Sequence, residues 1–361
     1  MEHTDFEMFA GQKVAGKAVP MLRVSHVARQ FGGRQAVQDV SLSVCPGQVT
    51  CLLGSSGCGK STTLRMIAGI EQLDAGSIHI DGQLVADRNG SLRPEKRSVG
   101  MVFQDLALFP HMTVFDNIAF GMARDQRRTA DVEQMLDRVG LRGYGAKYPH
   151  QLSGGEQQRI ALARALATGP KVMLLDEPFS SLDQRLRSEM REFALDLLRE
   201  AGAAVVLVTH DPDEAMMMAD RIAIMDQGRV LQQGAPLDLY HRPANLAVAQ
   251  FFSDLNLLPG KVSHGGVATG IGAISAGPLA EGTAVTCAIR PEHLRPARST
   301  DGAACAKVSR IQKLGRENLI ELSLPETSQK LRCNIAGSCD FKLGDRVTLD
   351  YDPATVMVFP A

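Results

Sequence analysis

Short apolar runs alternate with amphipathic patterns between residue 21 and about residue 250. The runs at 49–54, 171–176 and 203–209 consist mainly of aliphatic residues. Runs of this length suit strands that are buried on both faces of a parallel sheet. Apolar residues at helical spacing lie between these runs: Val132, Met135, Leu136 and Val139, and again Leu186, Met190, Phe193 and Leu197. Because strands and helices alternate in this way in layered folds, the pattern predicts an α/β domain.

The pattern changes beyond about residue 255, where strand-like segments are separated by Gly, Pro and Asp turns. These segments are 283–294, 307–315, 318–324 and 345–353. No long helical pattern appears among them, so we expect a small all-β domain. The predicted organisation is a flexible N-terminal tail at 1–20, an α/β domain at 21–250 and an all-β accessory domain at 251–361.

Length and charge narrow the class of protein. The chain has 361 residues, enough for two domains, and its 39 basic and 40 acidic residues give a formal net charge of −1. This balance gives no indication of nucleic-acid binding, which usually shows as a basic excess. No run approaches the ~18 apolar residues of a membrane span, and acidic residues stand where a signal peptide needs positive charge. We therefore expect a cytoplasmic protein with no nucleic-acid partner.

A phosphate-binding loop is the strongest chemical signal in the chain. Gly54, Gly59, Lys60 and Ser61 complete the motif G-x-x-x-x-G-K-[ST] between a predicted strand and a predicted helix. Glycines let backbone N–H groups surround phosphates, Lys60 can reach the β- and γ-phosphates of a nucleotide, and Ser61 can ligate Mg²⁺. The predicted nucleotide-binding residues of this loop are Gly54, Ser55, Ser56, Gly57, Cys58, Gly59, Lys60, Ser61 and Thr62.

Two adjacent acids end the apolar run at 171–176. Asp176 stands at the end of a predicted strand, where P-loop enzymes hold Mg²⁺ through water. Glu177 is a second acid that can polarise an attacking water as a general base. The alternative for Glu177 is a turn acid before Pro178.

A second glycine motif, QLSGGEQQR at 151–159, raises the question of why one domain carries two anion sites. Ser153 precedes a helical pattern and is a predicted N-cap. The N-terminus of a helix attracts phosphate. The loop at 54–62 already provides a phosphate site, so the second motif needs a different explanation.

Together the two motifs resemble those of ATP-binding cassette (ABC) ATPases, and the resemblance covers essentially the whole chain after the tail. In that family two ATPase domains pair head to tail, and each ATP lies between the phosphate loop of one and the signature motif of the other. The resemblance therefore implies a head-to-tail homodimer that binds ATP with Mg²⁺. The signature residues expected to contact the partner's nucleotide are Ser153, Gly154, Gly155 and Glu156.

The remaining family motifs match in order. Gln104 corresponds to the residue that contacts Mg²⁺ and the attacking water, so the resemblance implies metal contacts from Ser61, Gln104 and Asp176. Asp183, in SLD, corresponds to the residue at the dimer seam. His210 corresponds to the switch histidine that touches the γ-phosphate, which implies a catalytic set of Glu177, His210 and Gln104. Phe31 stands where the family places an aromatic ring on adenine.

The C-terminal segments resemble the small accessory β-domain of bacterial importer ATPases, which implies an all-β, OB-like (TOBE-like) fold for this part of the chain. The resemblance implies a peripheral subunit on the cytoplasmic face of the inner membrane. Its partners would be integral permease subunits and, indirectly, a substrate-binding protein. The apolar segment at 106–122 is interpreted either as ordinary core or as a groove for a coupling helix of the permease.

The sequence of this subunit does not determine the transported substrate, and the family resemblance only favours one class of substrate over others. Phe179 in DEPFSSLD and the segment at 93–114 resemble ferric-ion importers, with polyamine, sulfate and sugar importers as alternatives. Two further alternatives stay open. One is a non-transport ABC ATPase, although neither a long coiled-coil insertion nor a second ATPase half occurs here. The other is a C-terminal domain that serves as a regulator-binding module.

Overall fold

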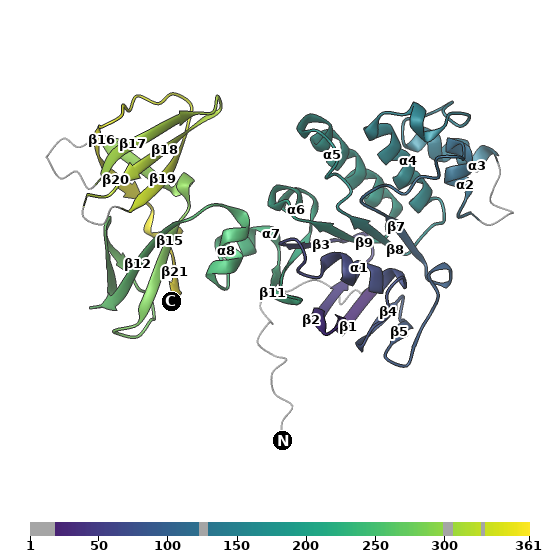
Figure 1. Ribbon diagram of the computed structural model, residues 1–361, viewed down its shortest axis with the longest axis horizontal. Helices are drawn as coiled ribbons and strands as arrows, with labels where there is room; N and C mark the ends of the chain where they lie inside the picture. The colour runs from purple at the N-terminus through teal and green to yellow at the C-terminus, as the bar shows by residue number, and fades with distance from the viewer. Residues whose placement is uncertain (1–18, 123–128, 299–305, 326–328) are drawn as a thin grey trace, which may run out of the picture. The chain divides into compact units, whose positions relative to one another are not determined.

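The computed structural model describes residues 19–122, 129–298, 306–325 and 329–361 (Figure 1). The chain divides into two compact units, one ending at Pro236 and one beginning at Leu237. An α/β unit is thus followed by an all-β unit, as the sequence predicts. Within the described residues, no helix has the length and apolar character that a bilayer crossing requires.

The N-terminal unit is built on an eleven-stranded sheet in the order β6-β5-β4-β1-β2-β11-β10-β3-β9-β8-β7. Its strands are β1 (Leu22–Phe31), β2 (Arg34–Val44), β3 (Val49–Gly54), β4 (Ala75–Ile80), β5 (Gln83–Asp87), β6 (Gly90–Ser91), β7 (Val99–Val102), β8 (Val172–Asp176), β9 (Ala204–Thr209), β10 (Arg221–Asp226) and β11 (Arg229–Gly234). Its helices are α1 (Lys60–Ala68), α2 (Val114–Ala119), α3 (Thr129–Arg138), α4 (Gly154–Leu166), α5 (Gln184–Ala201) and α6 (Pro212–Met218).

The centre of this sheet confirms the predicted buried strands. The three apolar runs form β3, β8 and β9, and every residue of these strands is buried. β7, β8, β9 and β3 are neighbours in parallel, with Val102 beside Leu175, Asp176 beside Val208 and Leu53 beside Thr209. The carboxyl ends of these strands therefore meet at one edge, where ligands bind in open α/β sheets.

The amphipathic helices also form, with one difference in detail. Met190 and Leu197 of α5 are buried as expected, but Leu186 is 39% exposed. Leu186 lies in the first turn of α5, and the buried face continues instead through Arg191, Ala194 and Leu198. The buried face of α5 thus includes a charged residue, Arg191, that the apolar pattern does not indicate.

The C-terminal unit contains two five-stranded sheets, visible separately in Figure 1. Their orders are β14-β13-β12-β15-β21 and β16-β20-β17-β18-β19. The strands are β12 (Asn256–Ser263), β13 (Gly266–Thr269), β14 (Gly272–Ser275), β15 (Ala284–Ile289), β16 (Leu294–Arg298), β17 (Ala306–Lys313), β18 (Glu317–Ser323), β19 (Lys330–Ala336), β20 (Arg346–Tyr351) and β21 (Met357–Pro360). Residues of both sheets, such as Leu258 and Ile320, share one core.

The helices α7 (Pro236–His241) and α8 (Leu246–Phe252) precede these strands. The sequence places the domain boundary at 250, whereas the contacts divide the chain after Pro236. The reason is visible in α8, where Ala249 is fully buried against Ala288 and Phe359 of the all-β unit. The C-terminal unit therefore includes these helices, whereas the pattern of strands alone would place its start later in the chain.

Candidate nucleotide site

The phosphate-binding loop joins β3 to α1, and its glycines are required by close backbone contacts. Gly59 has φ of 107°, and a Cβ there would lie 2.4 Å from the carbonyl oxygen of Ala36. A Cβ on Gly54 would lie 2.3 Å from the carbonyl oxygen of Met225. Since neither obstacle is a flexible side chain, a residue with a Cβ fits at neither place without a backbone shift.

The Lys60 ammonium lies inside this loop. Lys60 is buried, and its Nζ donates to the carbonyl oxygens of Gly54 at 2.7 Å and Ser55 at 2.9 Å. These neutral partners leave its positive charge available to an anion within the loop. Around it Cys58 and Gly59 are buried, Thr62 is half-buried, and Ser55, Ser56 and Gly57 are exposed.

Beside the loop is a cavity of about 350 Å³. Its polar walls come from the start of β2, from the loop itself and from the β10–β11 turn. The lining residues are Arg34, Gln35, Ala36, Gln38, Ser55, Ser56, Gly57, Cys58, Asp226, Gln227 and Gly228. A polar cavity that opens on a phosphate-binding loop is suited to a nucleotide.

Ser61 and Asp176 are brought together from α1 and the end of β8. The Ser61 hydroxyl donates to Asp176 Oδ1 at 2.8 Å. Burial raises the pKa of the Asp176 carboxyl, and the hydrogen bond from Ser61 partly opposes this rise. A hydroxyl beside a carboxylate supplies the oxygen donors that Mg²⁺ prefers.

Glu177 and His210 form a pair across the ends of β8 and β9. His210 Nδ1 lies 3.0 Å from Glu177 Oε2. Glu177 has φ of 45°, an unfavourable conformation for a residue with a side chain. Its N–H donates to the carbonyl oxygen of Val208 at 3.0 Å, and the Ser180 hydroxyl donates to its carbonyl oxygen at 2.9 Å. Strain of this kind clusters at functional sites.

A small cavity of about 40 Å³ adjoins this pair. It is lined by Glu177, Ser180, Arg187, Thr209, His210, Asp211 and Glu214. The volume is enough for an ordered water, and the walls offer it several polar partners. The arrangement therefore places a carboxylate and an imidazole where they can polarise water.

Gln104 and Phe31 are exposed residues at strand ends. Gln104 follows β7, which pairs in parallel with β8, so it stands at the same sheet edge as Asp176. Phe31 ends β1 and is 43% exposed. The Arg29 guanidinium lies 4.8 Å from the centre of the Phe31 ring. The ring is thus held by a cation and accessible for stacking.

The signature motif begins α4, and the predicted N-cap is confirmed. The Ser153 hydroxyl accepts a hydrogen bond from the Glu156 backbone N–H at 3.4 Å. The Ser153 backbone N–H donates to Glu156 Oε2 at 2.7 Å. The Ser153 hydroxyl also donates to Glu156 Oε2 at 2.8 Å. These hydrogen bonds, led by the one from the Ser153 backbone, lower the pKa of Glu156. The two residues form a reciprocal capping box.

The signature glycines differ from those of the phosphate loop. A Cβ on Gly154 would meet Leu182 Cδ2 at 3.7 Å, and one on Gly155 would meet Met190 Sδ at 4.0 Å. Both are ordinary contact distances, so packing within the chain does not demand glycine at either place. Asp183 is likewise engaged locally, because its Oδ1 accepts from the N–H groups of Arg185 and Leu186 at 3.1 Å and caps α5.

Several polar residues around this site are not indicated by the sequence pattern. Gln158 of α4 donates from Nε2 to the carbonyl oxygen of Pro178, which ties the signature helix to the turn after Glu177. Arg191 of α5 contacts Asp211 and Glu214 behind His210. The segment HDPDEA after β9 was an available signal for the two acids, but nothing in the pattern indicated Arg191 as their partner.

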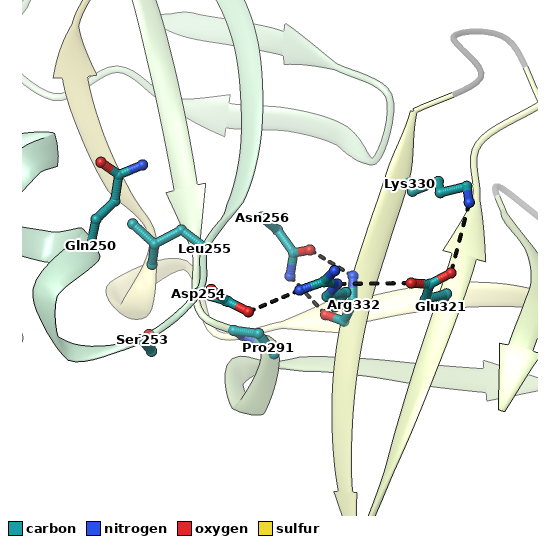
Figure 2. A pocket seen from close by; sticks show the side chains of 9 residues that line it. All are labelled: Gln250, Ser253, Asp254, Leu255, Asn256, Pro291, Glu321, Lys330 and Arg332. Atoms are coloured by element: carbon teal, nitrogen blue, oxygen red, sulfur yellow. Dashed lines mark hydrogen bonds and ion pairs between the residues drawn. The ribbon is translucent and has the colours of Figure 1, made fainter. Parts of the chain in front are cut away.

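A further cavity, of about 400 Å³, lies in the C-terminal unit (Figure 2). Arg332 Nη1 lies 2.8 Å from Asp254 Oδ2, and Lys330 Nζ lies 3.8 Å from Glu321 Oε2. The two cationic side chains of this cavity are therefore paired with two carboxylates, so the cavity has no excess positive charge that would favour a nucleotide. The lining residues are Gln250, Ser253, Asp254, Leu255, Asn256, Pro291, Glu321, Lys330 and Arg332.

Comparisons with known proteins agree with this geometry. Residues 37–180 match the family model described as ABC transporter, and residues 287–359 match that of the TOBE domain. A ferric-ion import ATP-binding protein of Rhodococcus jostii is 40% identical over 332 residues, 90% of this chain and 95% of the relative. The chain belongs to the ABC transporter family. Within that family it is an ATP-hydrolysing subunit of a bacterial importer, it binds ATP, and it acts with membrane permease components.

Other relatives in the ABC family are named for different cargoes. A sulfate/thiosulfate import ATP-binding protein of Chromobacterium violaceum is 47% identical over 276 residues, 75% of this chain and 74% of the relative. A spermidine/putrescine import ATP-binding protein of Rubrobacter xylanophilus is 38% identical over 359 residues, 95% of this chain and 94% of the relative. The family and the importing role are thus shown, while the named cargoes differ among relatives.

Proposed function

We propose that two copies of this ABC subunit pair head to tail and hydrolyse ATP at shared sites. Each site would combine the phosphate loop of one copy with Ser153, Gly154, Gly155 and Glu156 of the other. The observation that carries this proposal is the contrast between the two glycine motifs. Gly54 and Gly59 are required by their own chain, whereas Gly154 and Gly155 have room for a Cβ. Glycines without an internal reason are expected where another molecule approaches the backbone closely.

Within such a site, the residues of the sheet edge hold the nucleotide and its ion. Lys60 neutralises phosphate charge, and Phe31 stacks on the base. Ser61, Asp176 and Gln104 provide oxygen donors for Mg²⁺, which when bound neutralises charge on the phosphates. The described residues contain no cluster of three or more His, Cys, Asp or Glu suited to a metal.

Hydrolysis in this proposal depends on Glu177 and His210. Glu177 accepts a proton from the attacking water, and His210 contacts the γ-phosphate. Their separation of 3.0 Å supports a joint role, because the carboxylate can orient the imidazole. Asp183, at the start of α5, lies at the seam between the two copies.

The segment at 106–122 is proposed as the surface that receives the permease. Phe120 is 51% exposed and its ring centre lies 4.5 Å from that of Phe109. The buried Asn117 side chain fixes the turn beneath, since its Oδ1 accepts from the Phe109 N–H at 2.9 Å. An aromatic pair on a fixed turn, with Phe120 exposed and Phe109 half-buried, suits an apolar segment of a membrane subunit. The subunit would then act at the cytoplasmic face of the inner membrane.

Ferric iron is the cargo that we propose, delivered to the permease by a substrate-binding protein. The support is the ferric-ion import relative aligned over 95% of its length, together with a second from Pseudomonas fluorescens that is 49% identical over 246 residues, 68% of this chain and 70% of the relative. A polyamine is the second candidate, because the Rubrobacter relative aligns over 95% of this chain.

Reconstituted transport tests this proposal. The subunit and its permease are placed in vesicles, and ATP hydrolysis is measured when a loaded binding protein is added outside. We expect the iron-loaded protein to accelerate hydrolysis and Glu177→Gln to abolish the response. Acceleration by a polyamine-loaded or sulfate-loaded protein alone would overturn the iron assignment and leave the importer assignment intact.

A further inference from the structure

A buried cation lies behind the Glu177–His210 pair. Arg191 of α5 is only 7% exposed, and charged side chains are rarely buried without partners. Its Nη2 donates to Asp211 Oδ2 at 2.5 Å and to Glu214 Oε2 at 3.0 Å. One guanidinium nitrogen thus joins α5 to the residue after His210 and to α6.

Asp211 is the junction through which this cation reaches His210. Its Oδ1 accepts from the N–H groups of Asp213 at 2.9 Å and Glu214 at 3.2 Å, which caps α6. Its own N–H donates to the Thr209 hydroxyl at 3.0 Å. Because Arg191 also binds Oδ2, both carboxylate oxygens and the backbone N–H of Asp211 are engaged in hydrogen bonds. His210 lies between Thr209 and Asp211, so its backbone follows theirs.

A second arginine connects the same carboxylate to the start of α5. Arg187 Nη1 lies 3.9 Å from Asp211 Oδ2, and its Nη2 donates to the carbonyl oxygen of Leu182 at 2.8 Å. Leu182 directly precedes Asp183, the cap of α5. The turn that carries His210 is therefore linked to α5 and to the segment before it.

We infer that Arg191 is a positioning residue for His210, and that it acts through Asp211 by holding the 209–211 turn so that the imidazole faces Glu177. This inference rests on the catalytic roles proposed for Glu177 and His210. Arg191 itself contacts neither of them in any hydrogen bond of the described residues.

Stability alone does not explain this arrangement. Burial raises the pKa of Glu214 to about 6, although Arg191 opposes the rise, so the cation does not fully compensate the burial of this acid. Arg191 Nε and Glu214 Oε1 are also buried without a hydrogen-bond partner. Apolar residues of similar volume often replace such buried ion pairs without loss of stability. A network with this cost is better explained by the geometry that it imposes on its neighbours.

A double-mutant cycle on the full chain tests the inference. Single-turnover ATP cleavage and binding of a fluorescent ATP analogue are measured for Arg191→Met, His210→Ala and the double variant. We expect Arg191→Met to slow cleavage at least about tenfold and to change nucleotide affinity less than about twofold. In the His210→Ala background, Arg191→Met should have almost no further effect, because the residue that it positions is already absent.

Two further variants control the cycle. Arg191→Lys keeps the charge and should recover part of the rate, and it replaces Arg191→Met throughout if that variant does not fold. Arg199→Met removes an arginine of the same helix whose side chain is 55% exposed, and it should leave cleavage unchanged.

The outcomes separate the inference from the proposed function. Equal slowing by the Arg191 substitution in both backgrounds, or no slowing in the wild-type background, would overturn the positioning role alone. Unchanged cleavage in His210→Ala would overturn the catalytic role of His210 and, with it, the inference.

Discussion

Among single residues, Glu177 has the largest predicted effect on catalysis. Glu177→Gln keeps the shape of the side chain and removes its basicity. We expect it to bind ATP normally and to hydrolyse it slower by a factor of about 10² or more. Phosphate release and nucleotide binding on the same preparations measure the two properties. Glu189→Gln, at an exposed position of α5, is the matched control and should behave as wild type. Near-normal turnover in Glu177→Gln would transfer the role of general base to another group, with His210 the first candidate.

The raised pKa of Glu214 predicts that the stability of the fold depends on pH. Its pKa is raised from 4.5 to about 6 in the folded chain, chiefly by burial. Between these values the folded state binds more protons than the unfolded state, so stability falls as pH rises through this window. The expected loss is about 2 kcal/mol. Thermal unfolding from pH 4 to pH 7 should show a shallower decline in Glu214→Gln than in wild type. Identical pH profiles for the two proteins would contradict the raised pKa.

Residues in contiguous motifs could be predicted from the sequence, and residues joined across the fold could not. The spacing of Gly54, Gly59 and Lys60 is a chemical requirement of one loop, so it is visible in the chain itself. Arg191, by contrast, acquires its partners only when α5 packs beside α6. A single arginine in a helical pattern is usually a solvated residue, which is why its burial was not anticipated.

At the scale of elements, the start of α4 and the start of α1 should respond oppositely to alanine. Gly155→Ala meets no obstacle and should raise helix stability by up to about 1 kcal/mol. It should nevertheless slow hydrolysis, because in the proposed shared site the nucleotide of the partner contacts the backbone at the start of α4. Gly59→Ala, with φ of 107° and an obstructing carbonyl, should lower both stability and ATP binding. Thermal unfolding and ATPase assays measure both effects. Gly155→Ala with full activity would remove the reason for glycine in the signature.

Most elements were predictable because their patterns have clear physical causes. β3, β8 and β9 are continuous apolar runs, and α4 has a cap at Ser153. Exposure within an element was less predictable. Leu186 fits the apolar repeat of α5 but is 39% exposed, and it lies in the first turn of that helix, ahead of the buried residues.

For the whole molecule, the order of an α/β unit and an all-β unit followed from the change of pattern near residue 255. The division of the chain after Pro236 did not, because α8 packs with strands that are distant in sequence. The pattern of apolar and polar residues indicates neither the assembly nor the transported substrate. It does not show which copy contributes the signature motif to a site, so the proposed pairing has to be tested with two different variants in one dimer.

Mixed dimers test the shared site most directly. Lys60→Ala disables the phosphate loop of its own copy, and Ser153→Arg places bulk and charge on the signature that serves the other copy. Either variant alone should be inactive. A mixed dimer contains one site with both substitutions and one with neither, so an equal mixture should recover about a quarter of wild-type activity if sites act independently. The control mixture of Lys60→Ala with Glu177→Gln leaves a lesion in every site and should stay inactive. Activity in the Lys60→Ala and Ser153→Arg mixture that does not rise above this control would contradict a site shared between two copies.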